Sequence, residues 1–281
     1  MAPHTNAFDR RHFLVLASAL VAGHRPLNAR SSSRAPSPAS DAAPRLVALE
    51  LLTEAPLREV EEFYAKGLGL AVVAKSERRL TIAAGSTQLT FVATPAGSGR
   101  PFYHFAFNIP ENRIVEALTW QKARSALLPI PERLRDPEYP PEVVDYRHWN
   151  AHSIFFLDPG GNVVEYIARH DLKNVASGVF SARDILYASE IAFIVEDVPA
   201  AATRLKELVG VGQYRGGDAN FTALGNEAGL LLVMKRGRIL NFQPQSDEKA
   251  ARVFATGVRV RGVAPATYPI PGFPYTLTVE P

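Results

Sequence analysis

Cysteine is absent from the 281 residues of this chain. Disulfides, zinc sites built on thiolates and thiol nucleophiles are therefore excluded. An apolar run long enough to span a membrane is absent as well, because residues 13–23 fall short of the roughly 20 apolar residues that a spanning helix needs. The sequence also lacks a phosphate-binding loop, a dinucleotide fingerprint and a nucleophile elbow. Stable membrane insertion and the chemistries tied to those motifs are not expected.

The chain has little net charge once its first 44 residues are set aside. Those residues hold five arginines and two aspartates, whereas the rest holds 26 of the 31 basic and 26 of the 28 acidic residues. The formal charge of +3 therefore lies in the N-terminal segment. The remainder gives no electrostatic reason to bind nucleic acid, and we expect a small-molecule partner instead.

The first 44 residues resemble a twin-arginine export signal followed by a linker. Arg10 and Arg11 precede the apolar run at 13–23, which is the order that such signals show. Residues 31–44 are rich in serine, alanine and proline, a composition typical of a flexible linker. We expect an exported, periplasmic or extracellular protein, with cleavage near residues 28–29 or 41–43. The alternative is a disordered tail whose arginines carry no signal.

Hydrophobic periodicity after residue 44 predicts an α+β fold built from a repeated unit of one strand, one helix and three strands. Three such units fit the pattern, and a fourth complete unit does not follow. The expected strands are 46–52, 70–74, 79–83 and 88–93, then 103–109, 126–130, 153–157 and 163–167, then 189–195, 213–215, 220–224 and 229–235, with helices at 56–66, 110–124 and 198–209. Residues 258–261 and 276–279 could be closing strands.

This pattern suggests three regions. Residues 1–44 are expected to form the export signal and linker, and residues 45–170 one domain made of two paired units. Residues 185–281 would hold the third unit with a C-terminal tail, as a half-domain packed alongside or against a second chain. The second arrangement would make the protein a homodimer.

Residues 148–169 are the most informative segment, because they predict a β-hairpin with polar side chains inside it. Strands at 153–157 and 163–167 flank the turn sequence Asp-Pro-Gly-Gly-Asn. Glu165 lies in the middle of an apolar strand, where a carboxylate is costly without a partner. A turn centred on residues 159–160 would place His152 on the same face as Glu165, so both would face one cavity.

This hairpin and the strand Phe-Tyr-His-Phe-Ala-Phe-Asn at 102–108 resemble the vicinal oxygen chelate superfamily, which includes glyoxalase I, extradiol dioxygenases and bleomycin-resistance proteins. The turn and return strand match its D-P-x-G-N-x-x-E motif, and residues 63–70 match its F-Y-x-x-x-L-G-F join. The resemblance covers residues 45–169, and residues 185–235 more loosely. It implies tandem βαβββ modules with His104 and Glu165 as metal ligands. The reaction stays open, because this fold serves many chemistries.

The resemblance further implies that four positions converge in the cup formed by two paired units. In this sequence those positions carry Leu46, Gln88, His104 and Glu165. Leucine cannot ligate a metal, so the predicted ligands are His104, Glu165 and Gln88, with His152 as a catalytic residue that compensates for the missing ligand. Imidazoles and a carboxylate suit a divalent ion of iron, manganese or zinc.

Each candidate also has a purely structural interpretation. His104 could be a satisfied core histidine, and Glu165 could be paired with Arg169 or with a backbone donor. Glu190 occupies the opening-strand ligand position of the third unit, although its closing strand offers no evident histidine or glutamate. Glu190 is therefore a weaker candidate ligand.

The long segment 131–150 is rich in proline, tyrosine and charge. Segments of this length inside a compact domain are usually functional or disordered. We expect it to form a lid in which His148, Trp149 and Tyr146 contact the substrate.

Two functions of different class remain. The first is an exported, metal-dependent enzyme that acts on a small oxygenated substrate, for which an aromatic compound is one option, by dioxygenation, isomerisation or lysis. The second is a metal-free protein that sequesters a small molecule, as bleomycin-resistance proteins do. Loss of a ligand at Leu46 favours the second function, whereas His104, Glu165 and His152 favour the first.

Overall fold

Two mixed β-sheets organise the protein in the computed structural model, which describes residues 45–243, 248–261, 266–270 and 272–280. The predicted export signal and linker at 1–44 lie outside the described residues. In spatial order the first sheet contains β14 (Ala266–Pro269), β15 (Tyr275–Glu280), β13 (Thr256–Arg261), β1 (Arg45–Thr53), β4 (Thr87–Ala93), β3 (Arg79–Ala84) and β2 (Ala71–Lys75). The second contains β10 (Gln213–Gly217), β11 (Phe221–Asn226), β12 (Gly229–Lys235), β9 (Tyr187–Val195), β5 (His104–Ile109), β8 (Val163–Arg169), β7 (Ala151–Leu157) and β6 (Val144–Tyr146).

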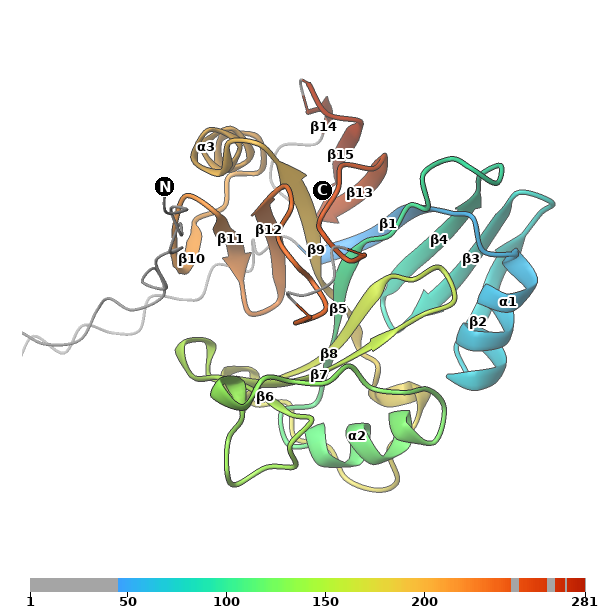
Figure 1. Cartoon of the computed structure of the whole chain (residues 1–281), viewed down its shortest axis with the longest axis vertical. Coiled ribbons are helices and arrows are strands. Elements are labelled where there is room, and N and C mark those ends of the chain that lie inside the picture. Colours follow the sequence, from blue (N-terminus) through green and yellow to red (C-terminus); the bar gives the residue numbers. More distant parts are fainter. Residues whose placement is uncertain (1–44, 244–247, 262–265, 271, 281) are drawn as a thin grey trace, which may run out of the picture. The chain divides into compact units, whose positions relative to one another are not determined.

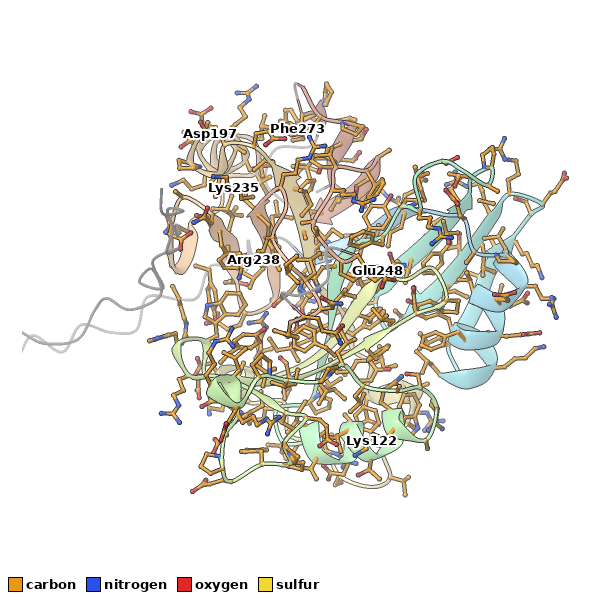
Figure 2. All side chains as sticks on the ribbon, viewed as in Figure 1. Lys122, Asp197, Lys235, Arg238, Glu248 and Phe273 are labelled. Carbon is orange, nitrogen blue, oxygen red and sulfur yellow. The ribbon has the colours of Figure 1, made fainter. Side chains whose placement is uncertain are left out.

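The longer helices follow the opening strand of each predicted unit (Figure 1). They are α1 (Leu57–Glu61), which continues as a π-helical turn at Glu62–Gly67, then α2 (Ile114–Lys122) and α3 (Val198–Val209). The Asp197 side chain, labelled in Figure 2, caps α3 by accepting a hydrogen bond of 3.0 Å from the Ala200 amide. Gly210 ends the same helix with a φ of 74°, a conformation that glycine adopts without strain.

The repeated unit is confirmed, but the units do not pair as predicted. Unit one does not pair with unit two: β5 runs antiparallel to β9 of unit three, and β1 runs antiparallel to β13. The strands β13, β14 and β15 form a fourth, incomplete unit in which the described residues include no helix, with β13 and β15 parallel like the opening and closing strands of the complete units. The expected pairing within 45–170 is wrong because each opening strand keeps a free edge, and any later unit can pair with that edge.

The second unit also differs from its prediction in its second strand. The expected strand at 126–130 is reduced to an isolated bridge between Leu127 and Phe156. β6, which lies inside the predicted lid segment, pairs instead with residues 151–153 at the start of β7. The segment 131–150 is therefore partly regular structure, with β6 and two short 3-10 turns.

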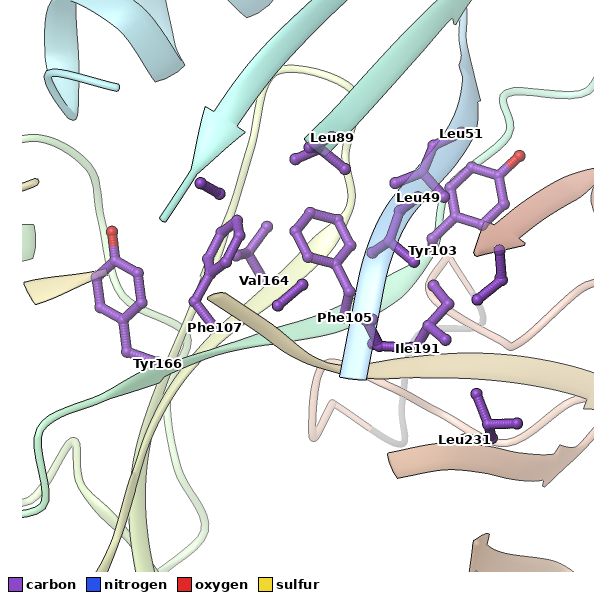
Figure 3. Close-up of a cluster of buried hydrophobic side chains, with 14 of the residues drawn as sticks. Leu49, Leu51, Leu89, Tyr103, Phe105, Phe107, Val164, Tyr166, Ile191 and Leu231 are labelled. Carbon is purple, nitrogen blue, oxygen red and sulfur yellow. The ribbon is translucent and has the colours of Figure 1, made fainter. Parts of the chain in front are cut away.

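One hydrophobic core joins both sheets. Figure 3 shows Leu49, Leu51 and Leu89 from the first sheet packed near Phe105 and Ile191 from the second. Leu46 belongs to this core and is only 2% exposed. Side chains alternate across a strand, so the residues between these core positions in the second sheet lie on its other face.

The turn of the β7–β8 hairpin is anchored by a buried hydrogen-bond network. Asp158 accepts hydrogen bonds from the Tyr64 hydroxyl at 2.7 Å and from the Asn162 side-chain amide at 2.7 Å. Burial raises the pKa of Asp158, while these donors lower it. The network holds the hairpin in the register on which the position of Glu165 depends.

Replacing Tyr64 by phenylalanine should destabilise the protein by about 1.5–3 kcal/mol, because Asp158 would lose a buried donor. Chemical denaturation gives this free energy of unfolding directly. Tyr268→Phe provides the matched control at a half-buried tyrosine of β14, and it should change stability by less than about 0.5 kcal/mol. Equal stabilities of the two variants would contradict the role assigned to the network.

Candidate metal centre

Three acidic or imidazole side chains meet on one face of the second sheet. His104 lies on β5, Glu165 on β8 and Glu190 on β9. Their register explains the convergence, because Ala106 of β5 is the backbone partner of both Glu165 and Glu190. One ligand atom from each side chain lies within 4.8 Å of the others, and His104 Nε2 is 3.5 Å from Glu165 Oε2. All three are at least nine-tenths buried.

The imidazole of His104 is oriented to offer a lone pair to this centre. Its Nδ1 lies 3.0 Å from the carbonyl oxygen of Val163, to which it donates a hydrogen bond. Burial, and secondarily the charge of Arg238 (Figure 2), lowers the pKa of His104 to about 4. The neutral ring therefore points its unprotonated Nε2 toward the carboxylates, as metal-binding histidines do.

The centre holds one buried arginine and two buried carboxyl groups. Arg169 forms a fully buried ion pair with Glu190. The pKa of Glu165 is raised well above its usual value, first by burial and then by the charge of Glu190. Glu165 Oε1 has no hydrogen-bond partner within the described residues. With both carboxylates ionised, Arg169 would pair with Glu190 and the charge of Glu165 would lack an ion-pair partner of its own, which a divalent cation would supply.

The donor set fits a divalent metal with open coordination positions. Units two and three can be compared position by position. In unit two, His104 lies two residues before Ala106, which pairs with Glu165. In unit three, Glu190 lies two residues before Ala192, which pairs with Leu232. The position equivalent to Glu165 in unit three is thus a buried leucine. Three side chains can ligate, and the remaining positions of an ion would be free for water or substrate.

Aromatic side chains and Arg169 line the same face. Tyr146 and Trp149 pack with Ala106, and their ring centroids are 5.8 Å apart. The Arg169 guanidinium lies 5.5 Å from the centroid of Trp149 and 6.0 Å from that of Tyr214. Burial raises the pKa of Tyr146, and the negative charges of Glu165 and Glu190 add to that effect. Tyr146 and Trp149 therefore lie beside the acidic centre.

Two of the predicted positions are not brought to this centre. Gln88 is exposed on β4 of the first sheet, opposite Ala48. Leu46 lies in the hydrophobic core. The prediction that these positions share a cup with His104 and Glu165 is corrected by the strand pairing, because unit two pairs with unit three and Glu190 takes the position assigned to unit one.

His152 faces the other side of the sheet. Leu157 pairs with Val163 and Phe155 with Glu165, so the register differs by one residue from the one predicted. A shift of one residue exchanges the faces of a strand. The physical reason is the connection at residues 158–162, which leaves Phe155, and not Ile154, opposite Glu165. The predicted partnership of His152 with the metal ligands is therefore wrong.

His148 is an exposed residue of the segment that leads into β7. Its carbonyl oxygen accepts a hydrogen bond of 3.1 Å from Arg215 Nη1. The structure gives its imidazole no contact with the centre, whereas Tyr146 and Trp149 of the same segment lie on the face of the centre.

The sequence offered Arg169 as a possible partner of Glu165, whereas in the structure Arg169 pairs with Glu190. The available signal was a pair of charges, Arg169 and Glu190, each embedded in an otherwise apolar strand. Such charges are rarely buried unless paired. Only the adjacency of unit two and unit three showed that they pair with each other.

Comparison with solved structures shows the fold. The chain is similar to a protein from Bacillus subtilis subsp. subtilis str. 168 described as a "putative dioxygenase", with 12% identity, a TM-score of 0.54, and coverage of 85% of this chain and 86% of the other. Glyoxalase I from Zea mays is similar with 12% identity and a TM-score of 0.49, over 84% of this chain and 92% of that one. No family model and no curated protein matches. The chain has the vicinal oxygen chelate fold, and its activity must be argued from its own residues.

Proposed function

We propose that this protein is a metal-dependent enzyme of the vicinal oxygen chelate type, with His104, Glu165 and Glu190 as ligands of one divalent ion. The observation that supports this proposal is that one ligand atom from each of the three side chains lies within 4.8 Å of the others on a buried face. Iron, manganese and zinc all suit one imidazole and two carboxylates. The substrate would be a small oxygenated molecule, aromatic or aliphatic, that undergoes dioxygenation, isomerisation or lysis.

Each residue around the ion would have a separate role. A bound ion would supply Lewis-acid or redox chemistry at a substrate oxygen. Val163 holds the His104 ring in its ligating orientation, and Arg169 orients the Glu190 carboxylate. Tyr146 keeps its phenolic proton because its pKa is raised. Together with Trp149 it would offer the substrate flat apolar surface and a hydrogen-bond donor while excluding water.

Metal analysis tests the proposal. Full-length protein purified without chelator or affinity tag is expected to lose one equivalent of divalent metal when His104 is replaced by alanine or Glu165 by glutamine. Oxygen uptake and ultraviolet absorbance of the metal-loaded protein with vicinal diols and 2-oxoaldehyde adducts would then report turnover. His148→Ala, which changes an exposed imidazole near the centre, is the control and should keep both metal and turnover.

A metal-free binding protein is the second candidate, and one observation favours it. The Arg169 guanidinium already supplies a positive charge beside Glu190 and lies near the rings of Trp149 and Tyr214. That arrangement could hold a planar ligand without a metal. Two results together would support this function. The metal content would be unchanged in His104→Ala and Glu165→Gln, and an aromatic ligand would bind tightly and quench the fluorescence of Trp149.

Export remains part of the proposal. None of the helices in the described ranges combines the length and the apolar character needed to cross a bilayer. Changing both Arg10 and Arg11 to lysine should trap full-length protein in the cytoplasm of the producing cell, because a twin-arginine signal requires the paired arginines. Cell fractionation measures the outcome, and Arg25→Lys with Arg30→Lys is the control. Normal export of the first variant would refute the signal.

A further inference from the structure

A second group of metal-ligating side chains lies on the opposite face of the same sheet. His152 on β7 is the cross-strand partner of Asp145 on β6. Asp136, from the segment before β6, approaches the same imidazole, and one ligand atom from each of the three lies within 4.8 Å of the others. The register that removes His152 from the first centre is what assembles this group.

The imidazole of His152 is held from two sides. Its Nδ1 lies 2.8 Å from Nε2 of His170, and its Nε2 lies 3.3 Å from Oδ2 of Asp136. The ring of Tyr139 stacks on it with centroids 4.0 Å apart and an interplanar angle of 25°. The side chain is thus fixed in direction before any ligand arrives.

The carboxylate of Asp136 is also oriented toward the group. Its Oδ1 accepts a hydrogen bond of 2.9 Å from the Glu138 amide, which leaves Oδ2 facing His152. Asp145 is paired at 2.6 Å with Arg147, whose side chain is 76% exposed and can move away into water. The three donors border a pocket of about 480 Å³, so an ion and its waters have room.

The tautomer of His152 decides whether a cation fits at this position. A neutral His152 donates from one ring nitrogen only. With its proton on Nε2, the ring would donate to Asp136 and accept a hydrogen bond from Nε2 of His170, and both contacts would be satisfied without an ion. The tautomer with its proton on Nδ1 is the one that suits a metal. When Nδ1 donates to His170, Nε2 presents a lone pair to the carboxylate oxygen of Asp136, and two lone pairs then oppose each other. A metal ion between them turns this opposition into two bonds, and His170 then plays the outer-shell part that commonly orients a ligating histidine.

We propose that His152, Asp136 and Asp145 form a second divalent metal site, with His170 as the residue that positions His152. One imidazole and two carboxylates suit a transition-metal ion of the zinc type, with water in the remaining positions. The site is independent of the first centre, because it lies on the other face of the sheet and shares no ligand with it.

Cobalt titration of tag-free, full-length protein tests the site, since Co²⁺ replaces zinc and its visible absorption reports the ligand set. The first-centre variant His104→Ala isolates the second site, and it is expected to bind one equivalent. Adding Asp136→Asn or His152→Ala to that variant should abolish this equivalent. His170→Leu should weaken binding about 10- to 100-fold, and His170→Gln, which keeps an acceptor, should recover part of it.

Glu138→Gln is the matched control, because it removes one negative charge from the lining of the same pocket without touching the three ligands. It should bind cobalt like its parent. Cooperative thermal unfolding of every variant excludes collapse. Equal binding by Glu138→Gln and Asp136→Asn, or no cobalt bound by the His104→Ala parent, would overturn the second site. The tautomer of His152 that donates from Nε2 to Asp136 and accepts from His170 would then explain the contacts. Neither result would bear on the first centre, which its own variants test.

Discussion

Replacing Glu190 by leucine while Arg169 remains is expected to destabilise the metal-free protein by about 3–5 kcal/mol. Arg169 is fully buried in the described structure, and its ion pair with Glu190 is the contact that neutralises it there. A guanidinium cannot lose its proton to escape the low dielectric of the interior, in contrast to a carboxyl group. Arg169 therefore keeps its charge at every pH at which the protein folds.

Urea denaturation of the variant measures this cost. The double variant Glu190→Leu with Arg169→Met removes both charges and should recover a substantial part of the loss, since apolar side chains of similar volume often replace a buried ion pair at little cost. Arg204→Met with Glu207→Leu is the control at an exposed ion pair of α3. A single variant that unfolds at the wild-type urea concentration would show that Arg169 finds another partner.

Glu165→Gln is expected to remove one contribution that makes the metal-free protein less stable as the pH rises. The folded pKa of Glu165 is raised by burial and by Glu190. Above the unfolded pKa of about 4.3, the folded state then holds a proton that the unfolded state has lost. Stability therefore falls as the pH rises through the folded pKa, and each unit of pKa difference corresponds to about 1.4 kcal/mol. The amide variant has no such proton to lose and should be the more stable protein at high pH.

His104 acts at the other end of the pH range. Its pKa is lowered to about 4, so the unfolded state binds a proton below the ordinary value near 6.5 and the folded state does not. Stability from His104 is thus lost as the pH falls from about 6.5 toward about 4. Melting temperatures between about pH 4 and 9 in chelator measure both effects, with Glu138→Gln as the exposed control. Parallel curves for wild type and Glu165→Gln would contradict the assignment.

Much of the fold could be predicted from local pattern. The helix at 198–209 was predicted to the residue because Asp197 caps its start and Gly210 ends it. The strands of the β7–β8 hairpin followed from alternation and from the turn residues between them. His104 and Glu165 come from one unit whose own strands pair, so a motif within that unit was enough to bring them together.

What the sequence determined by itself is the set of local elements and the polar residues embedded in them. Periodicity, caps and turn chemistry act over a few residues, so they are readable along the chain. The tertiary structure alone decided which unit pairs with which, and thereby put Glu190 and Arg169 beside His104 and left Gln88 on the other sheet. It also decided the face of His152, because one residue of register, set by the hairpin connection, exchanges the two sides of a strand.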